Sequence, residues 1–340
     1  MAAPAPPRRS PLRIVLLVLG GVAAVLVGLV VVLAAVPVAS VDLASRPDPA
    51  PDYAAAVERF DAISAEEERL GVFDKCRSRL LQHGERTAVS VVLVHGLTNC
   101  PQQWVEFAEA VHAQGANVLI LRVPHHGLAN ADGTAVGSVA NLAALTAPEL
   151  RAYGDTAADL AAGLGEDRRV MGLSMGGVIA SWIAQERDDV DRAVVIAPAL
   201  TLPVGPPWLT TGFENLFGRL PSITLPGSDK TGIDHVYNGE TTRGLVAMYR
   251  LGSYVRARSA STPPAVKAIA VDWNLNDNQV DNGQVQVLAR DWADGGADVT
   301  VHVFAADLGL PHDVIDPAQP TGDTAIVYPV LLEQLGFTAP

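Results

Sequence analysis

A serine between two glycines offers the clearest chemistry in this chain. An apolar run ends at Gly172 and leads through Ser174 to Gly176, giving a G-x-S-x-G sequence. A hydroxyl is a poor nucleophile until a base removes its proton, and a tight turn from a strand into a helix exposes Oγ to such a base. Glycines suit this turn because a Cβ would collide with neighbouring backbone. The motif also occurs in chance glycine-rich turns, so its surroundings decide whether it is a nucleophile elbow.

An aspartate and a histidine follow Ser174 along the chain, each in a loop after an apolar run. Asp277 follows the run 268–271, and His312 follows the run 299–304. All three preceding runs have the apolar character of buried strands. Open α/β sheets build their sites where the carboxyl ends of the strands meet. The order Ser, Asp, His at three strand ends therefore predicts that these side chains share one site.

Other acidic and histidine side chains nearby have simpler explanations. Asp272 lies at the end of its strand and is the alternative to Asp277. Asp281 fits the N-cap of the next helix, and Asp313 fits a helix cap or a solvent-facing position. His302 alternates with valines inside a strand, which indicates a strand-face side chain. The later histidine, which lies in a loop behind a proline, is therefore preferred.

A turn upstream of the serine offers backbone donors. The apolar run 89–94 ends at His95 and Gly96, which places a turn at the carboxyl end of another strand. Two backbone N–H groups at a fixed separation are what a tetrahedral oxyanion requires. We therefore expect an oxyanion hole formed by the N–H groups of Leu97 and Met175.

The histidines of this region do not have the spacing of a metal site. A catalytic zinc site uses about three protein ligands in a tight arrangement such as H-E-x-x-H, and the sequence contains no such motif. We expect His95 and His126 to be structural, with no metal and no organic cofactor.

Together these residues resemble the α/β-hydrolase superfamily, and within it the serine carboxylesterase and monoacylglycerol-lipase-like branch. The resemblance implies Ser174 as the nucleophile, His312 as the general base and acid, and Asp277 as the group that orients the imidazole. It also implies an acyl-enzyme intermediate. Relatives usually have a glycine or serine in the acid loop, where this chain has residues 274–276 as Asn-Leu-Asn. The likeness spans about residues 85–337 and is carried by 95–98, 122–127, 172–177, Asp277 three residues before Val280, and His312.

The remaining pattern predicts one large α/β domain over 53–340. Strand candidates alternate with helical segments such as 102–114, which favours a mostly parallel sheet with helices on both faces. The strand candidates are 89–94, 118–123, 169–172, 193–197, 267–272 and 298–304.

A segment at about 200–264 interrupts this alternation and is rich in proline, glycine and aromatic residues. We expect it to form a helical cap inserted after the strand at 193–197. Trp208, Phe213 and Phe217 are candidates for lining a substrate pocket under the cap. The alternative is that these three aromatic side chains only pack the cap onto the body.

The N-terminus predicts a membrane anchor. An unbroken apolar run over 14–36 follows the basic segment 1–13, and at ~1.5 Å per residue it would span ~35 Å, enough to cross a hydrocarbon core of ~30 Å. The positive-inside rule then keeps the N-terminus in the cytoplasm and the catalytic domain outside it. The alternative is a signal peptide cleaved near residues 38–40, followed by secretion. Residues 37–52 are expected to form a proline-rich linker that holds the enzyme away from the membrane.

The two cysteines of the chain, Cys76 and Cys100, both lie on the exported side of the predicted anchor. In an oxidising compartment they are expected to form a disulfide, provided that their Cα atoms lie within ~7 Å. The alternative is a pair of small buried apolar side chains.

The composition narrows the function. A formal net charge of −13 disfavours binding of the domain to nucleic acid or to anionic membrane surfaces. Richness in alanine, valine and arginine suggests a bacterial source. We expect a membrane-anchored serine hydrolase that cleaves small or lipid-derived carboxylic esters, such as a monoacylglycerol. The alternatives are a peptidase or thioesterase with the same triad, or a catalytically silent binding module tethered at the cell envelope.

Overall fold

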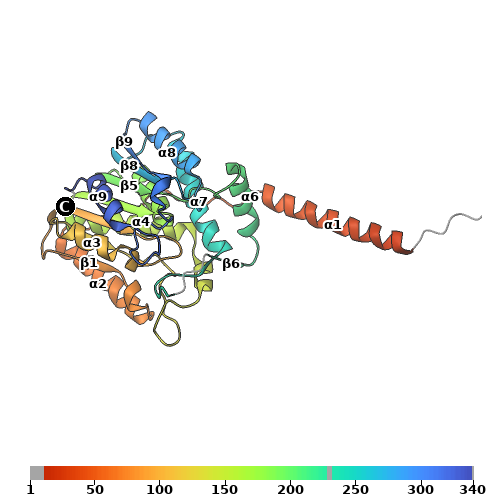
Figure 1. Cartoon of the computed structure of the whole chain (residues 1–340), viewed down its shortest axis with the longest axis horizontal. Coiled ribbons are helices and arrows are strands. Elements are labelled where there is room, and N and C mark those ends of the chain that lie inside the picture. Colours follow the sequence, from red (N-terminus) through yellow and green to blue (C-terminus); the bar gives the residue numbers. More distant parts are fainter. Residues whose placement is uncertain (1–10, 228–231, 339–340) are drawn as a thin grey trace, which may run out of the picture.

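The computed structural model describes residues 11–227 and 232–338 and has a mostly parallel β-sheet at its centre (Figure 1). The strand order is β1-β3-β2-β4-β5-β8-β9, and β1 alone of these runs antiparallel to its neighbour. This confirms the predicted fold class and adds an edge strand, β1, that the sequence pattern did not indicate. The strands are β1 Arg79–Leu81, β2 Thr87–Val94, β3 Asn117–Ile120, β4 Gly165–Leu173, β5 Arg192–Ile196, β8 Ala268–Asn274 and β9 Asp298–Phe304.

Helices cover both faces of this sheet. Residues 91–94 of β2 point alternately to the two faces, and all four are at most 2% exposed. On one face α3 and α9 meet through Phe107 and Tyr328, whose ring centroids lie 5.1 Å apart. The helices are α2 Tyr53–Arg69, α3 Val105–His112, α4 Ala147–Leu164, α5 Met175–Glu186, α7 Thr242–Ser259, α8 Asn282–Asp294 and α9 Thr324–Gln334; single 3-10 turns cover Asp74–Cys76, Pro101–Trp104, Val139–Ala144 and Ala306–Leu308.

The segment 200–264, here called the cap segment, lies between β5 and β8. It contains α6 Pro207–Phe217, the two-stranded hairpin of β6 Thr224–Pro226 and β7 Gly239–Thr241, and α7. Helix α7 packs against α4 and α5 and so belongs to the body of the domain. Figure 1 shows α6 and β6 outside that body, on the side from which the N-terminal helix projects.

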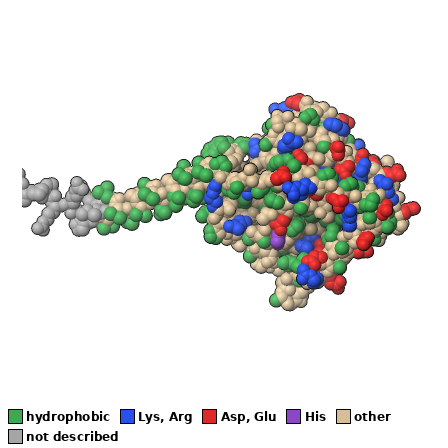
Figure 2. All heavy atoms as spheres, turned by 180° about the vertical axis from the view of Figure 1, so that it is seen from behind, with side chains coloured by type: hydrophobic (Ala, Val, Ile, Leu, Met, Phe, Trp, Pro, Cys, Tyr) green, Lys and Arg blue, Asp and Glu red, His purple; other side chains and the backbone are tan. Residues whose placement is uncertain are grey.

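The N-terminal helix α1 (Pro11–Ala35) stands away from the domain (Figures 1 and 2). Its stretch Val15–Ala35 is apolar, and none of the apolar window is buried against the rest of the chain. At ~1.5 Å per residue these 21 residues span ~32 Å, which matches a hydrocarbon core of ~30 Å. The helix thus has the length and composition of a membrane anchor or a signal sequence.

The linker that follows α1 is extended but is not a free spacer. Leu43 is 4% exposed, and its carbonyl accepts a hydrogen bond of 2.7 Å from the indole N–H of Trp182 in α5. Ser45 donates to the Asp155 carboxylate in α4 at 2.5 Å. The linker lies along the body because it supplies partners to buried polar groups there. The domain is therefore held close to α1 instead of at a distance.

Removing this linker is expected to destabilise the domain. A chain lacking residues 1–50 loses the burial of Leu43 and leaves Trp182 and Asp155 without these partners, at a cost of about 3–5 kcal/mol. A chain lacking only residues 1–36 retains all three contacts and serves as the control. Urea unfolding followed by circular dichroism measures the difference, and equal midpoints for the two chains would contradict this account.

Asp272 is a buried carboxyl within β8. It is 0% exposed, and neither carboxylate oxygen has a hydrogen-bond partner among the described residues. Burial raises its pKa to about 8, because the charged form loses its hydration without gaining a counter-charge. Asp272 is therefore protonated in the folded protein at neutral pH.

This carboxyl makes stability depend on pH. Its folded pKa is raised above the unfolded value, so the folded state holds a proton that the unfolded state releases, and stability falls as the pH rises from about 4 to 8. The slope contributed by this group approaches ~1.4 kcal/mol per pH unit. Asp272→Asn removes the titration with little change of volume. Denaturant unfolding at pH 5 and pH 8 measures how much of the free energy of unfolding is lost between the two pH values. This loss should be about 2–4 kcal/mol smaller for the variant than for the wild type. Parallel pH profiles of the two proteins would refute the assignment.

Candidate active site

Ser174 sits at a strained turn between β4 and α5. Its φ of 61° lies in the left-handed region, which a side chain other than glycine rarely adopts. Its N–H donates to the Ile196 carbonyl at 3.0 Å, which holds the turn against β5. A Cβ on Gly172 would lie 2.1 Å from the Gly176 carbonyl oxygen, and one on Gly176 would lie 2.0 Å from that of Val94. Glycine is needed at both positions because the main chain of the β4–α5 turn lies in contact with itself and with the end of β2, which leaves no room for a Cβ.

The predicted histidine and acid are paired. Nδ1 of His312 lies 2.5 Å from Oδ2 of Asp277. The Asp277 side chain is fully buried, that of His312 is 10% exposed, and the other carboxylate oxygen accepts the Gln279 N–H at 2.8 Å. A histidine that donates its Nδ1–H to a carboxylate presents Nε2 as the basic nitrogen. The arrangement supplies a base with a fixed ring orientation.

Asn274, the last residue of β8, holds the acid and histidine loops together. Its amide nitrogen donates to the carbonyls of Leu310 and Pro311 at 2.7 and 3.0 Å. Its own side-chain oxygen accepts the Asn276 N–H at 3.0 Å. In the sequence, Asn274 stands out only because related proteins usually have a glycine or serine in this loop. The structure shows it bridging the two loops that carry Asp277 and His312.

Ser174 and His312 border one small cavity, and Ser174 also borders a larger apolar one. The first has a volume of about 140 Å³ and the second about 320 Å³. Leu97 and Glu240 border both, so the two cavities meet beside the serine. His302, the alternative to His312, borders neither cavity. Asp272, the alternative to Asp277, is not paired with a histidine side chain. The second cavity is otherwise lined by Ala199, Leu202, Pro203, Phe213, Leu225, Leu245, Met248, Tyr249, Asn278 and Gln279.

The three aromatic residues predicted to line a pocket are placed differently from one another. Phe213 of α6 borders the larger cavity. Phe217 packs on Phe213 with ring centroids 4.6 Å apart and borders neither cavity next to Ser174. Trp208 is 69% exposed and lies outside both. The cavity walls from α7, among them Met248 and Tyr249, were not identified from the sequence because their spacing is that of an ordinary core face.

The two predicted oxyanion donors lie beside the serine. Met175 is the first residue of α5, so its N–H belongs to the helix's first turn, whose donors have no partner within the helix. Leu97 borders both cavities, and its carbonyl lies 2.8 Å from Nε2 of His126. The Gly96 N–H donates to Oε1 of Gln103 at 2.9 Å. The loop is thereby fixed on both sides of Leu97.

A buried polar network, not anticipated from the sequence, joins the oxyanion loop to the histidine loop. Nε2 of Gln103 donates to Asp313, the neighbour of His312, at 2.8 Å. Asn99 donates to the same carboxylate at 3.1 Å and to Asp316 at 3.2 Å. Asp313 is neither a helix cap nor exposed, contrary to both expectations: it is 9% exposed and accepts bonds from two backbone N–H groups of the turn after it.

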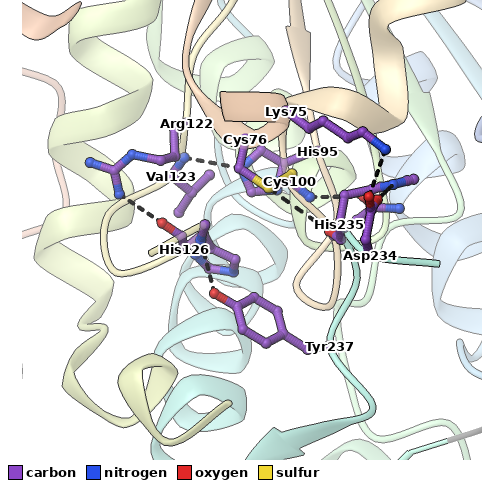
Figure 3. Close-up of a disulfide and its surroundings, with 12 residues drawn as sticks. Lys75, Cys76, His95, Cys100, Arg122, Val123, His126, Asp234, His235 and Tyr237 are labelled. Atoms are coloured by element: carbon purple, nitrogen blue, oxygen red, sulfur yellow. Dashed lines mark hydrogen bonds and ion pairs between the residues drawn. A yellow bond between two sulfur atoms is a disulfide. The ribbon is translucent and has the colours of Figure 1, made fainter. Parts of the chain in front are cut away.

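A buried disulfide lies next to this network in the chain, and Figure 3 shows it with His235 and His95 nearby. Cys76 and Cys100 are bonded, with an S–S distance of 2.04 Å and Cα atoms 5.1 Å apart. Beside it, His235 of the cap segment bonds Asp316 at 2.8 Å. Because Cys100 follows Asn99, the disulfide ties the oxyanion loop to the segment that precedes β1.

His95 and His126 have structural positions. Nε2 of His95 accepts the Val123 N–H at 3.0 Å, and its Nδ1 donates to the Gly96 carbonyl at 2.9 Å. Both rings are fully buried, and burial holds the pKa of His95 well below its usual range and lowers that of His126 to about 4. The two imidazoles are neutral at physiological pH and support the turn that carries Leu97.

Two comparisons find proteins that are similar to this chain in sequence. Residues 85–248 match the family model described as serine aminopeptidase, S33. A thermostable monoacylglycerol lipase from Bacillus sp. (strain H-257) is 27% identical over 186 residues. That alignment covers 52% of this chain and 66% of the lipase, slightly less than two thirds of its length.

Solved structures share the fold. A structure of the metagenome-derived lipolytic enzymes LipS and LipT matches with a TM-score of 0.56 at 19% identity, over 78% of this chain and 99% of the other. A monoacylglycerol lipase from Paleococcus ferrophilus matches with 0.54 at 18% identity, over 76% and 98%. A soluble variant of the monoglyceride lipase from Saccharomyces cerevisiae matches with 0.56 at 13% identity, over 76% and 91%. The chain therefore has the fold of the α/β-hydrolases, and its sequence is similar to the S33 serine aminopeptidase family over residues 85–248 and to a monoacylglycerol lipase.

Proposed function

We propose that this enzyme hydrolyses carboxylic esters with a triad of Ser174, His312 and Asp277. The observation that carries the proposal is the pairing of His312 with Asp277 at 2.5 Å, on the border of the same cavity as Ser174. A buried carboxylate fixes the imidazole, and a strained turn presents the serine to it. Each of the three comes from a different strand end, as in the predicted arrangement.

The proposed reaction has two halves. Oγ of Ser174 attacks the ester carbonyl carbon while Nε2 of His312 takes its proton. The N–H groups of Leu97 and Met175 hold the oxyanion, which forms and then collapses to release the alcohol, protonated by His312. Water next attacks the acyl-enzyme with His312 again as base, and the carboxylic acid leaves. Asp277 stabilises the imidazolium in both halves.

The substrate is proposed to be a lipid-derived ester such as a monoacylglycerol. Apolar side chains line the larger cavity, among them Leu202, Phe213 and Met248, and would accept an acyl chain. The similarity to monoacylglycerol lipases supports this choice.

We further propose that α1 is retained as a membrane anchor with the domain outside the cytoplasm. A disulfide between Cys76 and Cys100 fits an oxidising compartment. Cleavage near residues 38–40 would remove α1 and with it the groups that Asn215 and Arg219 of the cap segment bind. The arginines at 8 and 9 that set the orientation lie outside the described residues.

An aminopeptidase is the second candidate, and one observation favours it. Glu240 borders both cavities beside Ser174, and a carboxylate there would suit a protonated amino terminus. The matching family model is described as a serine aminopeptidase. Aminoacyl naphthylamides offered next to esters separate the two candidates, because only an aminopeptidase cleaves the amides efficiently.

The triad is tested with p-nitrophenyl esters of increasing acyl length. Ser174→Ala should lose about 10³-fold or more in kcat, and Asp277→Asn should lose about 10³–10⁴-fold because the histidine then adopts the wrong tautomer. Reaction of the wild type with an active-site phosphonate, lost in Ser174→Ala, locates the nucleophile. Wild-type turnover that survives in Ser174→Ala, or no labelling at Ser174, would contradict the proposal.

Gln103 is expected to act on catalysis through the oxyanion loop. Gln103→Leu removes both the acceptor of the Gly96 N–H and the donor to Asp313. Because the loop then loses its fixed position, kcat should fall about 10–100-fold with a smaller change in KM. Gln102→Leu, at the neighbouring position, is the matched control. Equal kinetics of the two variants would show that the bridge does not position the loop.

A further inference from the structure

The cap segment holds the carboxyl end of α1. Nδ2 of Asn215 donates to the Ala34 carbonyl at 2.9 Å. The guanidinium of Arg219 donates to the carbonyls of Leu33 and Pro37 at 3.2 and 2.7 Å. The last carbonyls of a helix have no partner within the helix, so these side chains complete the end of α1. The helix of membrane-spanning length is therefore attached to α6, the helix that borders the larger cavity.

One face of α6 lies against the end of α1 at Gly212 and Asn215. Trp208, Gly212 and Asn215 follow one another at spacings of four and three residues, which places them in one stripe of α6; Arg219 follows just beyond the end of the helix. Gly212 lies against Ala34, as a Cβ on it would come 3.8 Å from that side chain. Trp208 continues the stripe and is 69% exposed. An indole in this position is suited to the headgroup region, where tryptophan is enriched in membrane proteins.

Other exposed apolar side chains lie in the same segment. Val204, Leu209 and Ile223 are 75, 37 and 51% exposed. In Figure 2, hydrophobic side chains continue from α1 onto the adjoining part of the domain. Exposed large apolar side chains in the segment that holds the end of α1 indicate an interaction site there.

Arginines accompany these apolar side chains. Arg243 and Arg250 line a groove together with Val41 and Gly218, next to the end of α1. Arg219 of the cap segment binds the Leu33 carbonyl at the carboxyl end of α1. Their charge complements the phosphate groups of phospholipids. The net charge of −13 belongs to the whole chain and does not describe this surface.

We propose that this surface docks onto the phospholipid bilayer that α1 spans. The docking face consists of Val204, Trp208, Leu209, Ile223, Arg219, Arg243 and Arg250. The inference rests on the proposed membrane anchoring of the enzyme. A lipid bilayer is the occupant because α1 must leave the membrane where it meets α6. Phe213, on another side of α6, borders the catalytic cavity, so an ester in the outer leaflet lies about one helix width, ~10 Å, from that cavity.

Tryptophan fluorescence tests the docking directly. The other four tryptophans are at most 6% exposed, so Trp208 is the one that lipid can reach. The full-length chain and its Trp208→Phe variant are placed in vesicles of phosphatidylcholine and phosphatidylglycerol, with or without lipid brominated near the headgroup. The emission of Trp208, taken as the difference between the two proteins, should fall about twofold or more with brominated lipid. Emission unchanged by brominated lipid but quenched by acrylamide in the water would overturn the proposal.

Phosphonate labelling of the same samples separates this proposal from the proposed function. The fluorescence requires no turnover, and labelling of Ser174 requires no contact between Trp208 and lipid. Labelled protein whose Trp208 is not quenched would refute the docking face alone. Quenched protein that does not label would support the docking face and refute the ester hydrolase.

Discussion

The site depends on the close approach of the first turn of α5 to the ends of β2 and β4. Gly172 and Gly176 permit this approach, because a Cβ on either would come within 2.1 Å of a carbonyl oxygen. The approach forces Ser174 into its left-handed conformation and brings the start of α5 beside the turn that follows β2. The proposed nucleophile and the proposed oxyanion donors thus depend on the same backbone contact, which the sheet order makes possible by placing β2 and β4 side by side.

Polar side chains then connect the loops that the sheet alone would leave independent. Asn274 links the acid loop to the histidine loop, and Gln103 links the oxyanion loop to Asp313. These groups are buried, so each bond replaces hydration that has been lost, and a missing partner would leave an unsatisfied group. The disulfide and His235 attach the cap segment's loop and the segment before β1 to the same network.

Much of the fold could be predicted because apolar strands and the G-x-S-x-G turn leave clear local patterns. The strands β2, β3, β4, β5, β8 and β9 and the helix α1 were located within a few residues, and the expected disulfide between Cys76 and Cys100 is present. The edge strand β1 was missed because three residues are too short for a periodic pattern. Gln103 and Asn274 carry no local signal of their contacts, since their partners lie 210 and 36 residues away. The docked linker was missed for the same reason: proline content describes stiffness and says nothing of distant partners.

The contacts that fix the loops of the proposed triad and oxyanion hole mostly reach main-chain atoms. Asn274 binds the carbonyls of residues 310 and 311, Gln103 binds an N–H at 96, and His126 lies against a carbonyl at 97. The side chains at 97, 310 and 311 are not part of these bonds, so their identity is not constrained by them. Leu97 and Pro311 border the cavity beside Ser174, so sequence drift at these two positions can reshape its walls for a new substrate while the proposed reacting groups keep their places.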